Sequence, residues 1–208
     1  MRIPKTATVA LTAITVLATL LIGLVGENDR AAIVMGVIPS RLSGLISIPD
    51  AVPAWLTPLS ATLVHGGIIH LAFNMLMLVW CGTLVERVLG RSSLIILYVA
   101  GAYVSAIAQW LSDVTSPVPM IGASGAISAV IGAFSLMYGQ QKRIVKSPSL
   151  NRTLNALWLL AAWVVLQLMT GFLGQQQGYL LATAAHVGGF VTGLLLQRPL
   201  LLWRYRKA

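Results

Sequence analysis

The stretch of sequence that decides the fold is IGASGAISAVIGAF, residues 121–134. It reads as an apolar helix that opens on a hydroxyl group, Ser124, with small residues around it and again behind it at Ala129 and Gly132. Small side chains let another backbone approach closely, and the first turn of a helix offers N–H groups that have no partner within the helix. Whether these features serve packing or chemistry depends on what the rest of the chain brings beside them.

The composition around this stretch is that of a membrane protein. Of the 208 residues, 57% are hydrophobic and only 9% are charged, whereas soluble domains carry about 25% charged residues. The net charge of +9 does not indicate a nucleic-acid partner, because the basic residues are scattered over short connections. The single cysteine, Cys81, excludes an internal disulfide and a cysteine-based metal site. We expect neither a metal nor a cofactor.

Stretches without charged residues mark the candidate membrane spans, because a helix needs about 20 apolar residues to cross a bilayer. The stretch 153–197 is long enough for two spans and is broken at the glycine-rich segment GFLGQQQG, 171–178. We therefore expect an all-α membrane protein, a bundle of six transmembrane helices formed by one domain over 1–208. The expected spans are approximately 6–25, 62–85, 92–112, 122–140, 154–173 and 179–198.

The first span is interpreted as an uncleaved helix. Arg2 and Lys5 precede it, as basic residues precede the core of a signal peptide. Its apolar stretch is longer than the usual core of about 7–15 residues, and no small-x-small cleavage site precedes Glu27.

The basic residues are distributed unequally between the two sides of this bundle. With six spans both termini share a side, which holds twelve of the 14 basic residues, while Arg30 and Arg41 lie on the other side. Cytoplasmic connections carry an excess of Lys and Arg, so we expect both termini in the cytoplasm and contact with anionic lipids. The external connection 27–60 is apolar but broken by Pro and Gly, and we expect it to lie in the membrane interface.

Polar side chains recur near the external ends of the spans. The second span opens with HGGIIHLAFN, 65–74, in which His70 and Asn74 are four residues apart and share a helix face, while His65 is expected to face elsewhere. Such side chains within a span usually face the bundle interior.

The sixth span places a histidine on a glycine-lined face. Its segment AAHVGGFVTG, 184–193, has His186, Gly189 and Gly193 at spacings that put them on one side of a helix, and Gly-x-x-x-Gly permits close helix approach. At 1.5 Å per residue, the polar residues of spans two, four and six fall within roughly 10–15 Å of the external surface.

Each of these residues alone has a structural interpretation, since membrane serines bond to their own helix and glycine pairs serve packing. Together they indicate chemistry. His186 is the candidate base for the Ser124 hydroxyl, a poor nucleophile until its proton is removed. Gly125, Gly189 and Gly193 would allow the necessary approach, and the side chains of His70 and Asn74, with the backbone N–H of Ser124, would stabilise an oxyanion. No Asp or Glu is expected at this depth, which predicts a Ser–His dyad.

These motifs resemble those of the rhomboid intramembrane serine proteases, over most of the chain. GASG at 122–125 is similar to the family's G-x-S-G, HGGIIHLAFN at 65–74 to H-x4-H-x3-N, and AHVGGFVTG at 185–193 to A-H-x2-G-x3-G. The resemblance implies the minimal six-helix rhomboid core, with 27–60 as its interfacial L1 loop.

By this resemblance Ser124 is the nucleophile, His186 the base, and His70 and Asn74 the oxyanion helpers, while His65 is structural. The remaining supporting positions are the motif glycines, Gly122, Gly125, Gly189 and Gly193. The chain would be an endopeptidase of the bacterial inner membrane that cleaves single-span membrane proteins near the external, periplasmic boundary. Its partners would be transmembrane substrates and lipids.

Two positions depart from the family pattern. The L1 segment has Trp55 without the neighbouring arginine of many members, and Ser128 stands where some members place an aromatic residue against the histidine. A non-catalytic membrane protein that binds client helices is the alternative function. A small transporter fits less well, because the polar layer lies near one face only. Substrate, cleavage site, gating element and oligomeric state stay open.

Overall fold

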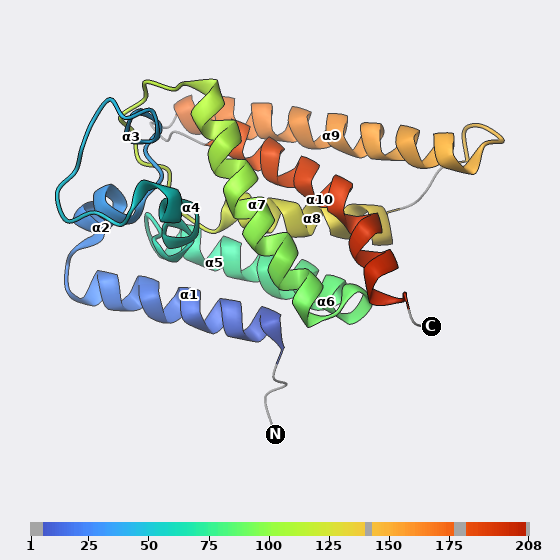
Figure 1. The fold of residues 1–208 in the computed structure, drawn as a ribbon, viewed down its shortest axis with the longest axis horizontal. Coiled ribbons are helices and arrows are strands. Elements are labelled where there is room, and N and C mark those ends of the chain that lie inside the picture. Colours follow the sequence, from blue (N-terminus) through green and yellow to red (C-terminus); the bar gives the residue numbers. More distant parts are fainter. Residues whose placement is uncertain (1–5, 140–142, 177–181, 207–208) are drawn as a thin grey trace.

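The computed structural model describes residues 6–139, 143–176 and 182–206. Over these ranges the chain is helical, with one isolated β-bridge between Val37 and Met120 in place of any sheet. The long helices, shown in Figure 1, are α1 (Ala7–Leu24), α5 (Ile68–Met77) continuing through the π-helical turn η3 (Leu78–Gly82) into α6 (Thr83–Leu89), α7 (Arg91–Ser112), α8 (Ser124–Tyr138), α9 (Pro148–Gln176) and α10 (Thr183–Arg204).

The protein is a multi-pass membrane protein. Among the described residues, four helical stretches are long and apolar enough to cross a bilayer: Ala7–Leu24, Ile68–Leu89, Arg91–Ser112 and Pro148–Met169. Helices α8 and α10 occupy the places expected of the fourth and sixth spans. With 15 residues, α8 is about 22 Å long, shorter than a hydrocarbon core of about 30 Å. A helix this short can start below the membrane surface.

The second long helix begins later than the sequence indicates, at Ile68 instead of residue 62. Residues Ala61–Leu63 form a 3-10 turn, η2, and Val64 is extended. Gly67 then adopts a φ of 143°, a backbone conformation that residues with a side chain rarely adopt. His65 therefore lies in a loop ahead of the helix, and helical spacing does not apply to it.

The ends of the long helices gather into two groups. At one end, the Ala7 N–H of α1 bonds Glu86 of α6, and the Tyr205 hydroxyl, just after α10, donates to the Val88 carbonyl. At the other end, the Gly122 N–H donates to the Ala61 carbonyl. Figure 1 shows the start of α1 and the end of α10 on the side of α6.

The connection between α1 and α5 is more ordered than an irregular interfacial loop. It contains α2 (Asn28–Met35), α3 (Pro39–Leu42), the 3-10 turn η1 (Ala54–Leu56) and α4 (Thr57–Ser60), followed by η2. The Arg41 guanidinium donates to the Val52 carbonyl at 2.6 Å, and the Trp110 indole of α7 donates to the Ser43 hydroxyl at 2.8 Å. The first bond joins two parts of the connection, and the second joins the connection to α7. Trp55, in contrast, has 67% of its surface exposed.

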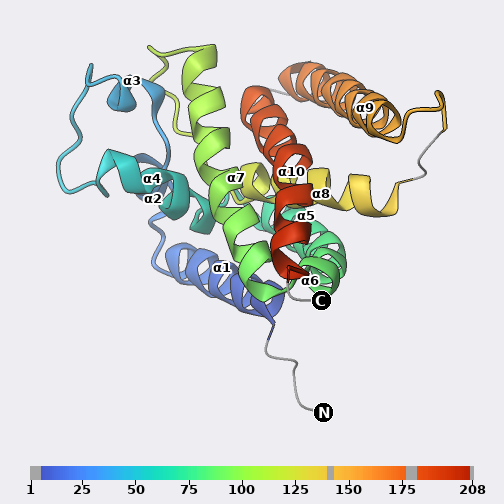
Figure 2. The same ribbon diagram turned by 45° about the vertical axis from the view of Figure 1, so that its right-hand side comes forward.

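Helices α7, α8 and α10 form the tightly packed centre of the protein. Figure 2 shows α7 and α10 running side by side across α8. A Cβ placed on Gly101 of α7 would lie 2.6 Å from the Ala129 side chain of α8, and one placed on Gly188 of α10 would lie 2.6 Å from Ala108 of α7. Small residues at these crossings bring the three backbones together, as expected where membrane helices pack closely.

Candidate active site

The Ser124 hydroxyl and the His186 imidazole meet across the α8–α10 contact. Ser124 is the first residue of α8, and His186 lies in the first turn of α10. The Oγ atom of Ser124 lies 2.8 Å from Nε2 of His186, a hydrogen bond between residues 62 positions apart. His186 is buried, with 8% of its surface exposed. The arrangement joins a hydroxyl to a potential base away from bulk water.

The glycines of the two motifs set the distance between α8 and α10. A Cβ on Gly189 would lie 2.1 Å from the carbonyl oxygen of Gly125, and one on Gly193 would lie 2.1 Å from the carbonyl oxygen of Ala129. Neither position can carry a side chain unless the helices separate. The small residues of the stretch 121–134 therefore serve packing, and this packing holds Ser124 against His186.

His65 joins α1 to the start of α8. Its Nδ1 lies 3.1 Å from the Thr19 hydroxyl of α1, and its Nε2 accepts the Ala123 N–H at 3.4 Å. Because Nε2 accepts, Nδ1 carries the proton of the neutral ring and donates to Thr19, whose hydroxyl donates to the Leu63 carbonyl. The expectation that His65 faces away from His70 is wrong: the two rings are in edge contact, with centroids 5.0 Å apart.

His70 lies against the backbone at Gly122, two residues before Ser124. Gly122 has a φ of 104°, and a Cβ there would lie 2.7 Å from Cε1 of the His70 ring. The buried Asn74 amide donates to the His70 carbonyl within α5, at 3.1 Å. Over the described part of the chain, no hydrogen bond joins the His70 or Asn74 side chain to Ser124. Their role in binding an oxyanion stays a prediction.

A small cavity of about 10 Å³ adjoins Ser124, room for about one water molecule. Its walls include Ser105 of α7 and Gly122. The Ser105 hydroxyl is fully buried and has no partner among the residues that the structure describes. The Ser105 hydroxyl could form a hydrogen bond with a water molecule in this cavity, beside the hydroxyl of Ser124.

Helix α9 supplies a residue that sequence reasoning missed. Oε1 of Gln167 lies 2.7 Å from Nδ1 of His186, and the Trp163 indole donates to the His186 carbonyl at 3.2 Å. The available signal was an amide within the apolar stretch 156–169, since polar groups in a span usually face the interior. His186 thus bonds two side chains, Ser124 through Nε2 and Gln167 through Nδ1.

No metal site accompanies this arrangement: within 6–139, 143–176 and 182–206, no three His, Cys, Asp or Glu side chains are grouped as ligands would be. The described groups around His186 are a hydroxyl and an amide, both uncharged. The Ser124 hydroxyl and Nε2 of His186 are close enough for a proton to pass between them.

Comparison with known proteins identifies the family. A family model described as the rhomboid domain matches residues 53–203, which include all three motifs. The chain belongs to the rhomboid family. This rhomboid is 32% identical over 142 residues to the rhomboid protease GluP of Bacillus subtilis, and 31% identical over 144 residues to RHOMBOID-like protein 5 of Arabidopsis thaliana. It is 27% identical over 137 residues to the rhomboid protease GlpG of Haemophilus influenzae.

These matches cover only part of each protein. They span 67%, 69% and 66% of this rhomboid, and 25%, 43% and 65% of the GluP, RHOMBOID-like protein 5 and GlpG chains respectively. This rhomboid therefore spans only part of the length of these relatives. Two of these relatives are named as proteases.

Proposed function

We propose that this rhomboid is an intramembrane serine endopeptidase that cleaves single-span membrane proteins near the external boundary of the membrane. The observation that carries the proposal is the bond of 2.8 Å between Ser124 Oγ and His186 Nε2. In a chain of the rhomboid family, that bond joins the two residues expected to perform proton transfer and nucleophilic attack.

The reaction begins when Ser124 Oγ attacks the carbonyl carbon of the scissile peptide bond. His186 Nε2 takes the hydroxyl proton, and the carbonyl oxygen becomes an oxyanion. The backbone N–H of Ser124 and the side chains of His70 and Asn74 are the groups available to stabilise this charge. His186 then gives its proton to the leaving amine, and the C–N bond breaks to leave an acyl ester on Ser124.

Water completes the cycle. His186 removes a proton from a water molecule, which attacks the acyl ester and forms a second oxyanion intermediate. Return of the proton to Ser124 Oγ releases the carboxylic acid product. The small cavity beside Ser124 and Ser105 is a place from which such a water could be drawn. Apart from this water, every group that acts on the substrate belongs to this chain.

We further propose six spans with both termini in the cytoplasm, a single domain over 1–208, and a site that opens toward the periplasmic side of the inner membrane. The gathering of Arg87, Arg91 and Arg204 at the end of the bundle where α6 meets α7 and α10 supports this orientation, because basic residues favour the cytoplasmic side. Transmembrane helices and lipids are the proposed partners.

The proposal is tested with the full chain in proteoliposomes that contain a single-span substrate. We expect the unaltered protein to cleave the substrate and Ser124→Ala to leave it intact, because the alanine has no nucleophile. Cleavage by both proteins would refute the dyad. Substrate binding without cleavage by either protein would instead favour the alternative, a non-catalytic protein that binds client helices.

A further inference from the structure

We propose that Gln167 of α9 is a positioning residue for His186. It holds the imidazole in the tautomer that carries its proton on Nδ1, so that Nε2 is available to accept the Ser124 proton. This inference rests on the proposed function. It adds a third residue, from a third helix, to a site that the sequence predicted as a dyad.

The hydrogen-bond geometry determines the tautomer. Oε1 of Gln167 can only accept, so the contact of 2.7 Å requires a proton on Nδ1 of His186. A neutral imidazole has a single N–H, which leaves a lone pair on Nε2, the atom that lies 2.8 Å from Ser124 Oγ. The opposite tautomer would place an N–H toward the hydroxyl, and His186 could not take its proton.

The hydrogen bond between Gln167 and His186 is buried, so its loss costs more than that of a bond on the surface. Gln167 and His186 have 6% and 8% of their surface exposed. An imidazole nitrogen in such a place has no bulk water to replace a lost partner, so removal of the acceptor leaves the Nδ1 proton unsatisfied. Among the described residues, Oε1 of Gln167 at 2.7 Å is the hydrogen-bond partner of Nδ1, so its loss removes the contact that favours one tautomer over the other.

Helix α9 holds His186 at two points. Trp163, one helical turn before Gln167, donates its indole proton to the His186 carbonyl at 3.2 Å. Its ring stacks on Phe190, one turn after His186, with centroids 4.8 Å apart and planes 10° from parallel. The packing between Trp163 and Phe190 therefore fixes the position along α9 from which Gln167 reaches the imidazole.

This arrangement accounts for the departure at Ser128. Ser128 stands one turn after Ser124, and its hydroxyl donates to the Ser124 carbonyl at 2.8 Å within α8. The hydroxyl proton of Ser128 is thus used within its own helix and does not hold the imidazole. Orientation of His186 comes from α9 and not from an aromatic side chain of α8.

The kinetic test compares Gln167→Met with Gln167→Glu. Methionine fills a similar volume without a strong acceptor, whereas the glutamate carboxylate can still accept the Nδ1 proton. We expect Gln167→Met to lower kcat about tenfold, as loss of one buried hydrogen bond implies, while KM changes little. Gln167→Glu should retain more of the kcat. Leu168→Ala, at a position 59% exposed on the same helix, is the control and should cleave like the unaltered protein.

A spectroscopic test does not depend on turnover. The chain has three histidines, so ¹⁵N labelling of histidine rings gives few signals, and His186→Ala assigns those of His186. We expect the ¹⁵N shifts to report a proton on Nδ1 in the unaltered protein and a mixture of tautomers in Gln167→Met. An unchanged tautomer or an unchanged kcat in Gln167→Met would overturn the inference. Absence of cleavage by the unaltered protein would refute the proposed function, and the tautomer measurement would still decide the role of Gln167.

Discussion

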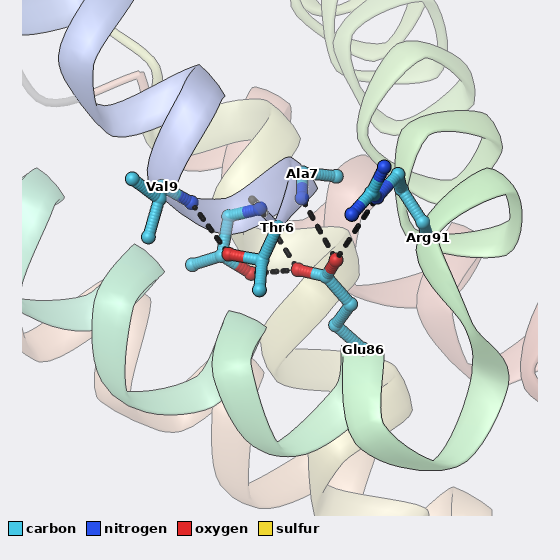
Figure 3. Close-up of polar contacts among 6 residues, drawn as sticks. Thr6, Ala7, Val9, Glu86 and Arg91 are labelled. Atoms are coloured by element: carbon cyan, nitrogen blue, oxygen red, sulfur yellow. Dashed lines mark hydrogen bonds and ion pairs between the residues drawn. The ribbon is translucent and has the colours of Figure 1, made fainter. Parts of the chain in front are cut away.

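Two polar clusters lie at opposite ends of this apolar bundle, and they use their hydrogen bonds differently. In the cluster around Glu86, shown in Figure 3, the carboxylate accepts the N–H groups of Ala7 and Thr8 at 2.7 and 2.9 Å and the Thr8 hydroxyl at 2.6 Å. Arg91 lies 4.0 Å away. In the cluster around His186, single neutral bonds join Ser124, His186 and Gln167.

The difference separates a structural cluster from one suited to catalysis. Glu86 caps the N-terminus of α1, where the helix dipole favours a negative charge, and both of its oxygens have fixed partners. The Ser124–His186 bond instead connects a proton to a base that can remove it. At one end a carboxylate joins α6 to α1, and at the other an uncharged hydrogen bond joins Ser124 to His186.

The largest effect should come from His186→Ala. Without the base, Ser124 stays a neutral alcohol, and we expect a loss of activity of at least about 10⁴-fold. Labelling of Ser124 by a fluorophosphonate probe should also disappear. The melting temperature should also fall by a few degrees, because the bonds to Ser124 and Gln167 are lost. Labelling that survives in His186→Ala would show that another group activates Ser124.

The next largest effect should come from Gly189→Ala, which separates α8 from α10. Its Cβ would lie 2.1 Å from the Gly125 carbonyl oxygen, and a displacement of about 1 Å at a reacting pair can cost about 100-fold in rate. Gly23→Ala is the matched control, because the nearest atom to its Cβ is 4.0 Å away. Equal cleavage rates for both variants, measured on one substrate, would contradict the proposed role of the close packing.

Glu86→Gln should lower the melting temperature and leave the cleavage activity almost unchanged, whereas His186→Ala should abolish the activity. Loss of the charge weakens the cap on α1, at a cost of about 2 kcal/mol, or a melting temperature lower by about 4–8 °C for a protein of this size. Thermal unfolding in detergent measures the shift, and cleavage per folded molecule should stay close to normal. A variant that melts normally but loses activity would place Glu86 with the catalytic cluster instead.

The smallest effect should come from Thr19→Val, which tests where His65 belongs. The substitution removes the hydroxyl that bridges the Leu63 carbonyl and His65 Nδ1, at a cost of about 1 kcal/mol. We expect a melting temperature lower by about 2–4 °C with little change in kcat. A large fall in kcat at an unchanged melting temperature would mean that His65 acts in the reaction and is not only a brace.

Most of the helical framework could be predicted from sequence, because spans are set by local hydropathy and by charged ends. The predicted 6–25 and 92–112 agree with α1 and α7 to within one or two residues. The second span was placed too early, because hydropathy does not register the backbone turn at Gly67. The same turn removed His65 from the helix and invalidated the face assigned to it by spacing.

The pairing of Ser124 with His186 could be predicted from the sequence for a different reason. Glycines at Gly189 and Gly193 predict a close helix contact, and the span order puts both polar residues in one layer. Gln167 escaped this reasoning because an amide in an apolar stretch indicates a side chain that faces the interior, but not which side chain it meets there. Trp163 and Phe190 set the rotation of α9 by stacking between two helices, a contact without a sequence pattern of its own.

Sequence by itself determined that this chain crosses a membrane in several helices and carries a serine and a histidine at comparable depth. These properties follow from hydropathy, charge and helical periodicity, which are local. Tertiary structure decided which nitrogen of the histidine faces the serine, which helix holds the other nitrogen, and that Glu86 caps α1. Those outcomes depend on how helices rotate and how closely they approach, and side-chain packing between distant segments sets both.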